Sequence, residues 1–337
     1  MHYIRLFGLI VVSIMVVLIP LFTHSPYYLD LIILIMLNSV LAMTFVMLLR
    51  VGLINLSITA FWGMGAYISA ILIMNYDFPF WASLPASALV TGAIAWGLGY
   101  ILIGRRSTGF SFVILSAVMG MLFTIVVSSI SFLGGYIGIH NIPPPDPINM
   151  PFLPTIIFVS KVQYFYLMLI LFVVIILICK ALYSSWTGPA WAATGLDHRL
   201  AESVGINTFR FRMFAFTLAS AIAGLMGSFY ASYQGFIAPT TFGMWRNIYI
   251  QIYAILGGVG FVVSGPIIGS AVMTFLTEFL RPFNVIAPLI TGILLIILIV
   301  FLPQGLLGLL QYKNIVTGWR LNTTKTREVI LSAFHFK

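Results

Sequence analysis

The chain has 337 residues, of which 61% are hydrophobic and 7% are charged, whereas a soluble domain carries about 25% charged residues. This composition excludes a water-soluble fold, since too little polar surface is available to cover the apolar side chains. The net charge of +9 does not indicate nucleic-acid binding, because the basic residues punctuate apolar segments instead of clustering on a polar face. We therefore expect an all-α, polytopic transmembrane helical bundle.

About ten apolar runs follow one another, each long enough to cross a hydrocarbon core of roughly 30 Å. The predicted spans are Leu6 to Phe22, Tyr28 to Leu49, Asn55 to Met74, Trp81 to Ile103, Phe110 to Phe132, Tyr164 to Tyr183, Phe211 to Tyr233, Ile248 to Ser264, Pro266 to Leu280 and Ile286 to Leu302. The first run is long for a signal-peptide core and lacks a small-residue cleavage pattern after it, so we expect a retained span.

The distribution of basic residues sets the expected topology. With the N-terminus inside, thirteen of the sixteen lysines and arginines fall on the cytosolic side, and only Lys161, Arg246 and Arg281 fall on the opposite side. Such a bias fixes the orientation of membrane proteins. We expect a multi-pass membrane protein with both termini in the cytosol.

Residues 1–310 are expected to form one transmembrane domain with two long loops. The loop 134–163 contains Pro143, Pro144, Pro145 and Pro147, faces the exterior and serves either as a stiff connector or as a docking surface. The loop 184–210 faces the cytosol. The tail 311–337 carries five basic residues and one acid, and is expected to lie in the cytosol near anionic lipid.

The chain lacks the residues of a catalytic or cofactor site. Its single cysteine, Cys179, lies in an apolar run, and its five histidines all fall in loops or termini. No spaced-histidine metal motif, paired-aspartate site or phosphate-binding loop occurs in the sequence. The missing motifs predict no metal site and no cofactor, and because no charged residue lies in the middle of a predicted span, we expect no proton relay. Sodium coupling through neutral oxygens is left open as an alternative, and the simpler inference is that the energy comes from another polypeptide.

One span carries two ridges of small residues at four-residue spacing. The first ridge is Ala219, Ala223, Gly227 and Ala231, and the second is Ser220, Gly224, Ser228 and Ser232. Small residues at this spacing let helices approach closely. We expect them to serve helix association, within the chain or with a partner.

Two segments, 52–67 and 251–269, mix polar residues with helix-weakening glycines. Helices interrupted at membrane depth are tolerated where freed backbone groups face protein or water, and they indicate a translocation pathway. The candidate pathway residues are Asn55, Ser57, Thr59 and Gln251. The alternative is that these polar groups bond internally.

Three motifs resemble the permease subunits of branched-chain amino-acid ABC importers, in particular their longer, M-type membrane subunit. The first is Gly52 to Tyr67, GLINLSITAFWGMGAY, which departs from the family pattern at Ser57 and Ile58. The second is Ala201 to Asn207, AESVGIN, followed by the span 215–230. The third runs from GGVG at 257–260 through GPIIG at 265–269 to PQGLLG at 303–308.

The resemblance implies four partners: a related second permease, two cytosolic ATPase subunits and an extracytoplasmic solute-binding protein. It also implies that the loop around 201–207 contains a short coupling helix that fits a groove in the ATPase. The residues expected to serve ATPase coupling are Asp197, His198, Arg199, Glu202 and Gly205. The expected solutes are branched-chain, aliphatic amino acids, with urea, short amides or another small solute as alternatives.

Three other classes of function remain open from the sequence. A stand-alone secondary transporter would move solute without ATPase partners. A membrane-embedded enzyme would need a catalytic constellation in mid-membrane. A purely structural protein would be indifferent to substitutions at Asn55 and Gln251.

Overall fold

The structure, a computed structural model, describes residues 20, 25–104, 109–147, 157–283, 289–290, 292–293, 296 and 305–308. Its long helices are α2 (Pro26–Arg50), α3 (Ile58–Tyr76), α4 (Phe80–Ile103), α5 (Gly109–Ser129), α6 (Lys161–Ser184) and α9 (Thr208–Gln234). The shorter helices are α7 (Thr187–Leu196), α8 (His198–Ser203), α10 (Met244–Gly257) and α11 (Ser264–Leu280). The remaining elements are the 3₁₀ turns η1 (Ser131–Leu133), η2 (Pro239–Phe242) and η3 (Arg281–Phe283) and the strands β1 (Ile139–His140) and β2 (Phe236–Ile237).

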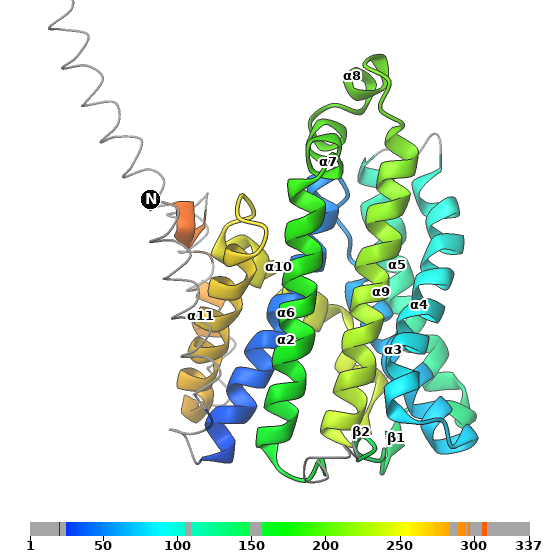
Figure 1. Cartoon of the computed structure of the whole chain (residues 1–337), viewed down its shortest axis with the longest axis vertical. Coiled ribbons are helices and arrows are strands. Elements are labelled where there is room, and N and C mark those ends of the chain that lie inside the picture. The colour runs from blue at the N-terminus through cyan, green and yellow to red at the C-terminus, as the bar shows by residue number, and fades with distance from the viewer. Residues whose placement is uncertain are drawn as a thin grey trace, which may run out of the picture.

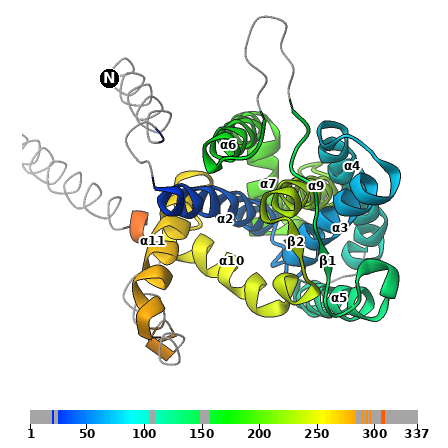
Figure 2. The ribbon, with the colours of Figure 1, turned by 90° about the horizontal axis from the view of Figure 1, so that it is seen from below.

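The long helices run side by side as a bundle (Figure 1). Helix α9 packs extensively on α3 and α4, while α2 packs on α6, α9, α10 and α11. Seen along the bundle, α3, α4 and α5 group with α9 on one side, and α10 and α11 extend from α2 on the other (Figure 2). The segment α7–α8 lies at one end of the bundle and the β1–β2 pair at the opposite end.

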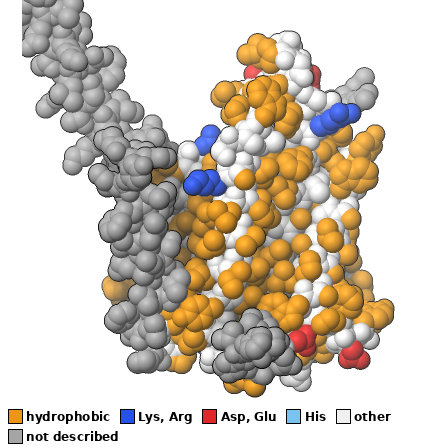
Figure 3. Space-filling view, in the orientation of Figure 1, with side chains coloured by type: hydrophobic (Ala, Val, Ile, Leu, Met, Phe, Trp, Pro, Cys, Tyr) orange, Lys and Arg blue, Asp and Glu red, His pale blue; other side chains and the backbone are white. Residues whose placement is uncertain are grey.

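Six of the described helices, α2, α3, α4, α5, α6 and α9, are long and apolar enough to cross a membrane. The all-α polytopic bundle is thus confirmed, with a two-residue antiparallel strand pair added to it. The middle of the face in Figure 3 is mainly hydrophobic, and the charged side chains lie toward its two ends, as lipid surroundings require. The count of about ten spans and the cytosolic location of both termini stay predictions.

The helix boundaries follow local sequence signals. Pro26 occupies the first position of α2, where a missing N–H costs no hydrogen bond. Helix α6 begins with a capping box, in which the side chain of Gln163 accepts the backbone N–H of Ser160 at 2.7 Å. Helix α9 begins at the side chain of Asn207, which accepts the N–H of Arg210, and ends at Gly235 with φ of 67°.

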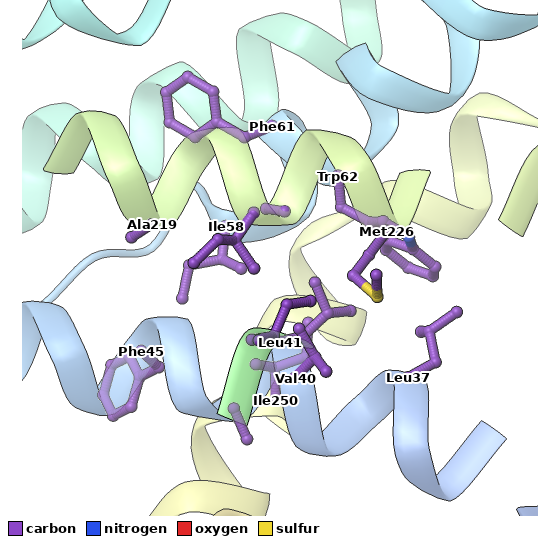
Figure 4. Packing of buried hydrophobic residues seen from close by; sticks show 14 of the residues in the cluster. Leu37, Val40, Leu41, Phe45, Ile58, Phe61, Trp62, Ala219, Met226 and Ile250 are labelled. Atoms are coloured by element: carbon purple, nitrogen blue, oxygen red, sulfur yellow. The ribbon is translucent and has the colours of Figure 1, made fainter. Parts of the chain in front are cut away.

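The core lies between α2, α3, α9 and α10. Figure 4 shows Leu37, Val40, Leu41 and Phe45 of α2 beside Ile58, Phe61 and Trp62 of α3, Ala219 and Met226 of α9, and Ile250 of α10. Every one of these side chains is at least 98% buried. The two segments suspected of forming a pathway therefore border the best-packed region of the molecule.

The small residues of α9 bring it into backbone contact with α3, which confirms their expected role in helix association. A Cβ added at Gly65 would lie 2.0 Å from the carbonyl oxygen of Gly224, and one added at Gly227 would lie 2.0 Å from that of Trp62. Further along the same contact, Ser228 donates to Ser69 at 2.8 Å, and Ser69 is bonded to Ser83 of α4 at 3.1 Å. Small side chains thus permit the crossing, and serines link the three helices.

Two predicted spans have limits that differ from those of the helices in the structure. Helix α3 starts at Ile58 instead of Asn55, so Asn55 and Ser57 belong to the connection after α2. Helix α10 starts at Met244, four residues before the predicted Ile248, and ends at Gly257, because Gly258 adopts φ of 111° and turns the chain. Most of the predicted spans 6–22 and 286–302, and the whole tail 311–337, fall outside the described residues.

The end of the bundle opposite α7–α8 is fixed by polar contacts. Strands β1 and β2 pair antiparallel, with His140 stacked on Phe236 at 4.3 Å. Asp146, beside the proline cluster, accepts the N–H of Phe80 at 2.6 Å and so anchors the loop to the start of α4. Lys161 lies 3.0 Å from Asp30, which joins the first turns of α6 and α2. Part of the loop 134–163 is therefore tied to the bundle.

Candidate functional site

The four predicted pathway residues come together between α3 and α10. Oδ1 of Asn55 accepts the N–H of Ser57 at 2.9 Å and its hydroxyl at 2.6 Å. Nε2 of Gln251 donates to the backbone oxygen of Asn55 at 3.4 Å. Asn55, Ser57 and Thr59 are at least 99% buried, and Gln251 is half-buried. The polar groups that interrupt the two segments thus bond largely to one another.

A fifth member of this cluster, Asn247, was not predicted. Its Oδ1 accepts the N–H of Thr59 at 3.4 Å, so a side chain in the first turn of α10 caps the first turn of α3. Asn247 is fully buried, and its Nδ2 has no hydrogen-bond partner among the described residues. Ser116 of α5 completes the arrangement by accepting the N–H of Leu56 at 3.0 Å. The sequence offers little signal for either residue, because Asn247 follows Arg246 in a predicted loop and Ser116 is a single serine in an apolar run.

A narrow cavity adjoins this cluster between α2, α3 and α9. Its walls are formed by Leu48, Asn55, Ile58, Phe61, Ala219, Ser220 and Ala223. It encloses about 140 Å³ of empty space, none of it wide enough for a water molecule. The Ser220 hydroxyl is buried and makes no hydrogen bond to the described residues. The cavity therefore combines mainly apolar walls with one buried hydroxyl that has no hydrogen-bond partner among the described residues.

Arg246 lies deeper in the bundle than its predicted loop position. Because α10 begins at Met244, Arg246 belongs to its first turn, and Nη2 donates to Oδ1 of Asn38 at 3.1 Å. Asn38 is the central residue of the 25-residue helix α2. The Arg246 guanidinium carbon also lies 5.7 Å from the ring centre of Trp62. The charge therefore lies in the first turn of its own helix, while its guanidinium reaches the middle residue of α2.

The predicted coupling segment forms two short helices, α7 and α8, at one end of the bundle (Figure 1). Asp197 separates them and caps α8, accepting the N–H of Arg199 at 2.8 Å and that of Leu200 at 3.2 Å. The Leu200 and Arg199 N–H groups lower the pKa of the Asp197 carboxyl below its usual range. Asp197 thus supports the short helix from its exposed end.

The other predicted coupling residues have separate positions. Glu202 accepts the Thr208 hydroxyl at 2.5 Å, which fastens α8 to the start of α9. Gly205 has φ of 86° and ends the turn after α8, where only open space lies beside it. His198 and Arg199 lie on exposed surface. The five residues therefore surround one helix, but they do not form a single contact cluster.

Apolar side chains around α8 were missed by the sequence analysis. Leu196, Leu200 and Val204 are 88%, 68% and 71% exposed, respectively. Large apolar groups at the end of a bundle, rimmed by Arg199 and Glu202, are typical of a surface for another protein. In the sequence these three residues are apolar positions beside charged ones in a predicted loop. That pattern alone does not show which side chains are exposed.

The α7–α8 segment is joined to the connection that carries Asn55. A Cβ added at Gly195 would lie 2.3 Å from the carbonyl oxygen of Arg50 and 3.2 Å from the N of Gly52. From the first half of α9, Nε of Arg212 donates to the carbonyl oxygen of Val51 at 3.3 Å. Only residues 53–57 lie between Gly52 and the start of α3 at Ile58. Helices α7 and α9 therefore contact the backbone that leads to the polar cluster.

The chain belongs to the family described as the permease component of branched-chain amino-acid transport systems, whose pattern it matches over residues 27–303. The match includes the polar cluster, the narrow cavity and the α7–α8 segment. The resemblance noted in the sequence motifs is thus confirmed over most of the chain.

Two relatives are named as high-affinity branched-chain amino acid transport system permease protein LivM. The protein of Escherichia coli K12 is 30% identical over 287 residues, which are 78% of this chain and 66% of the relative. The protein of Salmonella typhimurium LT2 is 29% identical over 280 residues, which are 76% of this chain and 64% of the relative. The chain thus spans slightly less than two thirds of each relative. No solved structure was found to match it.

Proposed function

We propose that this chain is the transmembrane permease subunit of an ATP-driven importer of branched-chain, aliphatic amino acids. It forms part of the translocation pathway in the inner membrane, and the pathway includes Asn55, Ser57, Thr59 and Gln251. Its proposed partners are a related second permease, two cytosolic ATPase subunits and an extracytoplasmic solute-binding protein. The chain itself contributes no catalytic residue and binds no ATP.

One observation carries this proposal: the same short connection touches both the α7–α8 segment and the polar cluster. Gly195 packs against Arg50 and Gly52, and Asn55 lies three residues after Gly52 in the sequence. When the ATPases close on α8, the motion of α7 displaces residues 51–57 and rearranges the start of α3. The hydrogen bonds of Asn55 and Asn247 then change partners, and the narrow cavity opens to one side of the membrane.

The solute class follows from the lining of the cavity and from the family. Leu48, Ile58 and Phe61 offer apolar contacts to an aliphatic side chain, while Asn55 and Ser220 offer neutral polar groups. The same lining suits urea or a short amide less well, because these solutes lack an aliphatic side chain. LivM of Escherichia coli is named for branched-chain amino-acid transport, which supports the same choice.

The proposal is tested with the tagged full chain expressed from its native locus and purified with its bound partners. We expect two ATPases and a second permease to copurify, and L-leucine uptake into proteoliposomes to require ATP. Uptake of L-leucine without ATP or ATPases would identify a secondary transporter instead. Preference for urea over L-leucine would change the assigned solute.

The coupling assignment is tested in the same complex by replacing Arg199 and Glu202 together with alanine. We expect weaker ATPase binding or the loss of solute-stimulated ATP hydrolysis. Asp77→Asn at the opposite end of the bundle is the matched control, because asparagine also tolerates the φ of 50° found there. If the double variant leaves both complex assembly and ATP hydrolysis unchanged, α8 is not the coupling helix.

A further inference from the structure

Arg246 is a half-buried cation without an acidic partner in the described part of the chain. Of the seven acidic residues, only Glu328 lies outside that part. The other six are engaged elsewhere or lie in turns at the ends of the bundle: Asp30 with Lys161, Asp77 at the end of α3, Asp146 with Phe80, Asp197 with α8, Glu202 with Thr208, and Glu278 with Arg281. The positive charge of Arg246 is therefore not balanced by any of these six residues.

The position of Arg246 makes this imbalance costly. It contacts Asn38, which lies about 18 Å along α2 from either end of that helix at 1.5 Å per residue, beyond the reach of lipid headgroups. An arginine at such depth is unfavourable and is retained when it has a functional role. It also lies in the first turn of α10, where the helix dipole already disfavours a cation. Both effects favour an anion beside it.

Two donors at the start of α10, Nε of Arg246 and Nδ2 of Asn247, have no hydrogen-bond partner among the described residues. Asn38 and the face of Trp62 hold the guanidinium in place, while its Nε is buried without a hydrogen bond to the described residues. The adjoining Asn247 is fully buried and has a free Nδ2 in the same part of the chain. Guanidinium and amide N–H groups at the start of a helix form the donor set of a carboxylate site.

We infer that Arg246, with Asn247 and the N-terminus of α10, binds the α-carboxylate of the solute during translocation. This inference rests on the proposed function and deepens it, since it assigns one end of the amino acid to a named residue. The carboxylate balances the charge of Arg246, and the apolar side chain extends toward the core between α2 and α3. A neutral solute such as urea could not balance that charge.

The test uses the purified full chain in lipid nanodiscs with its copurifying partners retained. Its probes are L-leucine, isovalerate, which keeps the carboxylate, and L-leucinamide, which lacks it. We expect both carboxylates to change the fluorescence of Trp62, identified by its loss in Trp62→Phe, and L-leucinamide to bind about ten-fold or more weakly. Equal binding of L-leucine and L-leucinamide, or no binding of either carboxylate, would overturn the inference.

Variants give a second measurement. Arg246→Gln is expected to weaken L-leucine binding and uptake about ten-fold or more, and Arg246→Lys less, because lysine keeps the charge but loses the planar donor pair. Arg281→Gln is the matched control, since Arg281 is exposed and paired with Glu278 outside this site. Unchanged L-leucine binding by Arg246→Gln would contradict the inference. If that variant does not fold, the three probes on the unaltered protein decide the question.

The same experiment separates a solute carboxylate from a carboxylate side chain of the second permease. If the partner supplies the anion, Arg246→Gln loses the second permease on purification while its L-leucine binding stays unchanged, and the inference is wrong. Failure of the proposed function looks different, because the complex would then lack ATPases or transport L-leucine without ATP. The binding of the three probes is measured without ATP and without transport, so it tests the carboxylate site separately from the proposed function.

Discussion

Oδ1 of Asn247 accepts the backbone N–H of Thr59 at 3.4 Å, which ties the first turns of α10 and α3 together across 188 positions of the sequence. Replacing Asn247 with leucine leaves this buried N–H without an acceptor. We expect the free energy of unfolding to fall by about 1–3 kcal/mol. The thermal midpoint of the purified chain measures this loss.

Asn75→Leu is the matched control for Asn247→Leu. Asn75 is exposed near the end of α3, the helix that contains Thr59. It should leave the midpoint nearly unchanged. Asn247→Asp keeps the acceptor oxygen and should be less destabilising than Asn247→Leu. Equal midpoints for Asn247→Leu and the unaltered protein would show that the contact contributes nothing to stability.

The crossing of α3 and α9 depends on the absence of a side chain at Gly65. An alanine Cβ at this position would lie 2.0 Å from the Gly224 carbonyl oxygen, so the two helices must separate. We expect Gly65→Ala to destabilise the fold by about 1–3 kcal/mol, in the range found for overpacked cores. Denaturation of the purified protein in detergent measures the change.

Gly97→Ala provides the comparison for Gly65→Ala. Gly97 lies in α4 with nothing within 4 Å of an added Cβ. Because alanine favours helix by about 1 kcal/mol over glycine, this variant should be neutral or slightly stabilising. If both variants behave alike, close helix packing is not what requires glycine at position 65.

Leu200 presents its side chain to the surroundings at the end of the bundle, with 68% of its surface exposed. Under the proposed function, Leu200→Asp should weaken ATPase binding about ten-fold, as expected when a central apolar contact is lost. The thermal midpoint of the isolated chain should not change. Pull-down of the ATPases at graded concentrations measures the affinity.

Leu200→Met serves as the control, since methionine keeps a similar volume and an apolar contact. It should retain most of the ATPase binding. Normal binding by Leu200→Asp would remove this part of α8 from the proposed interface.

Asp197 makes the order of α8 dependent on pH. The Leu200 and Arg199 N–H groups lower its pKa in the folded state, so the cap is present above the ordinary range of a carboxyl pKa. It is lost as the pH falls through the lowered folded-state value. At pH 7, Asp197→Ala should therefore speed hydrogen exchange of residues 198–204 several-fold, after correction for intrinsic rates.

Asp197→Asn tests the chemical basis of that effect, because asparagine also caps helices and carries no charge. Protection of 198–204 should survive in this variant and should not change between neutral and acidic pH. Rapid exchange in Asp197→Asn at pH 7 would show that the charge, and not the cap, orders α8.

Much of the bundle could be predicted from hydrophobic length alone. The predicted limits of α2, α4, α5, α6 and α9 agree with the structure within three residues at every end, because apolar runs and caps such as Asn207 are local signals. The interrupted segments also led to Asn55, Ser57, Thr59 and Gln251 as candidate pathway residues, but not to the prediction that these residues cluster. Whether they line a solute pathway stays a prediction.

The remaining features depend on contacts between distant positions. Trp245, Arg246 and Asn247 indicate a loop when viewed alone, whereas Asn38 and Thr59 stabilise them inside a helix. Likewise, the exposure of Leu200 depends on how α8 sits on α9, which the Glu202–Thr208 bond fixes. Neither relationship leaves a periodic pattern in the sequence.

The narrow cavity beside Asn55 has an electrical consequence. Under the proposed function, the pathway is too narrow at this point for a water molecule, so a chain of waters that could pass protons or ions is interrupted here. In this conformation, that stretch of the subunit acts as an insulator. We therefore expect proteoliposomes that contain the resting complex to hold a membrane potential as long as empty ones do, and Phe61→Gly, which opens the cavity wall, to increase the leak current.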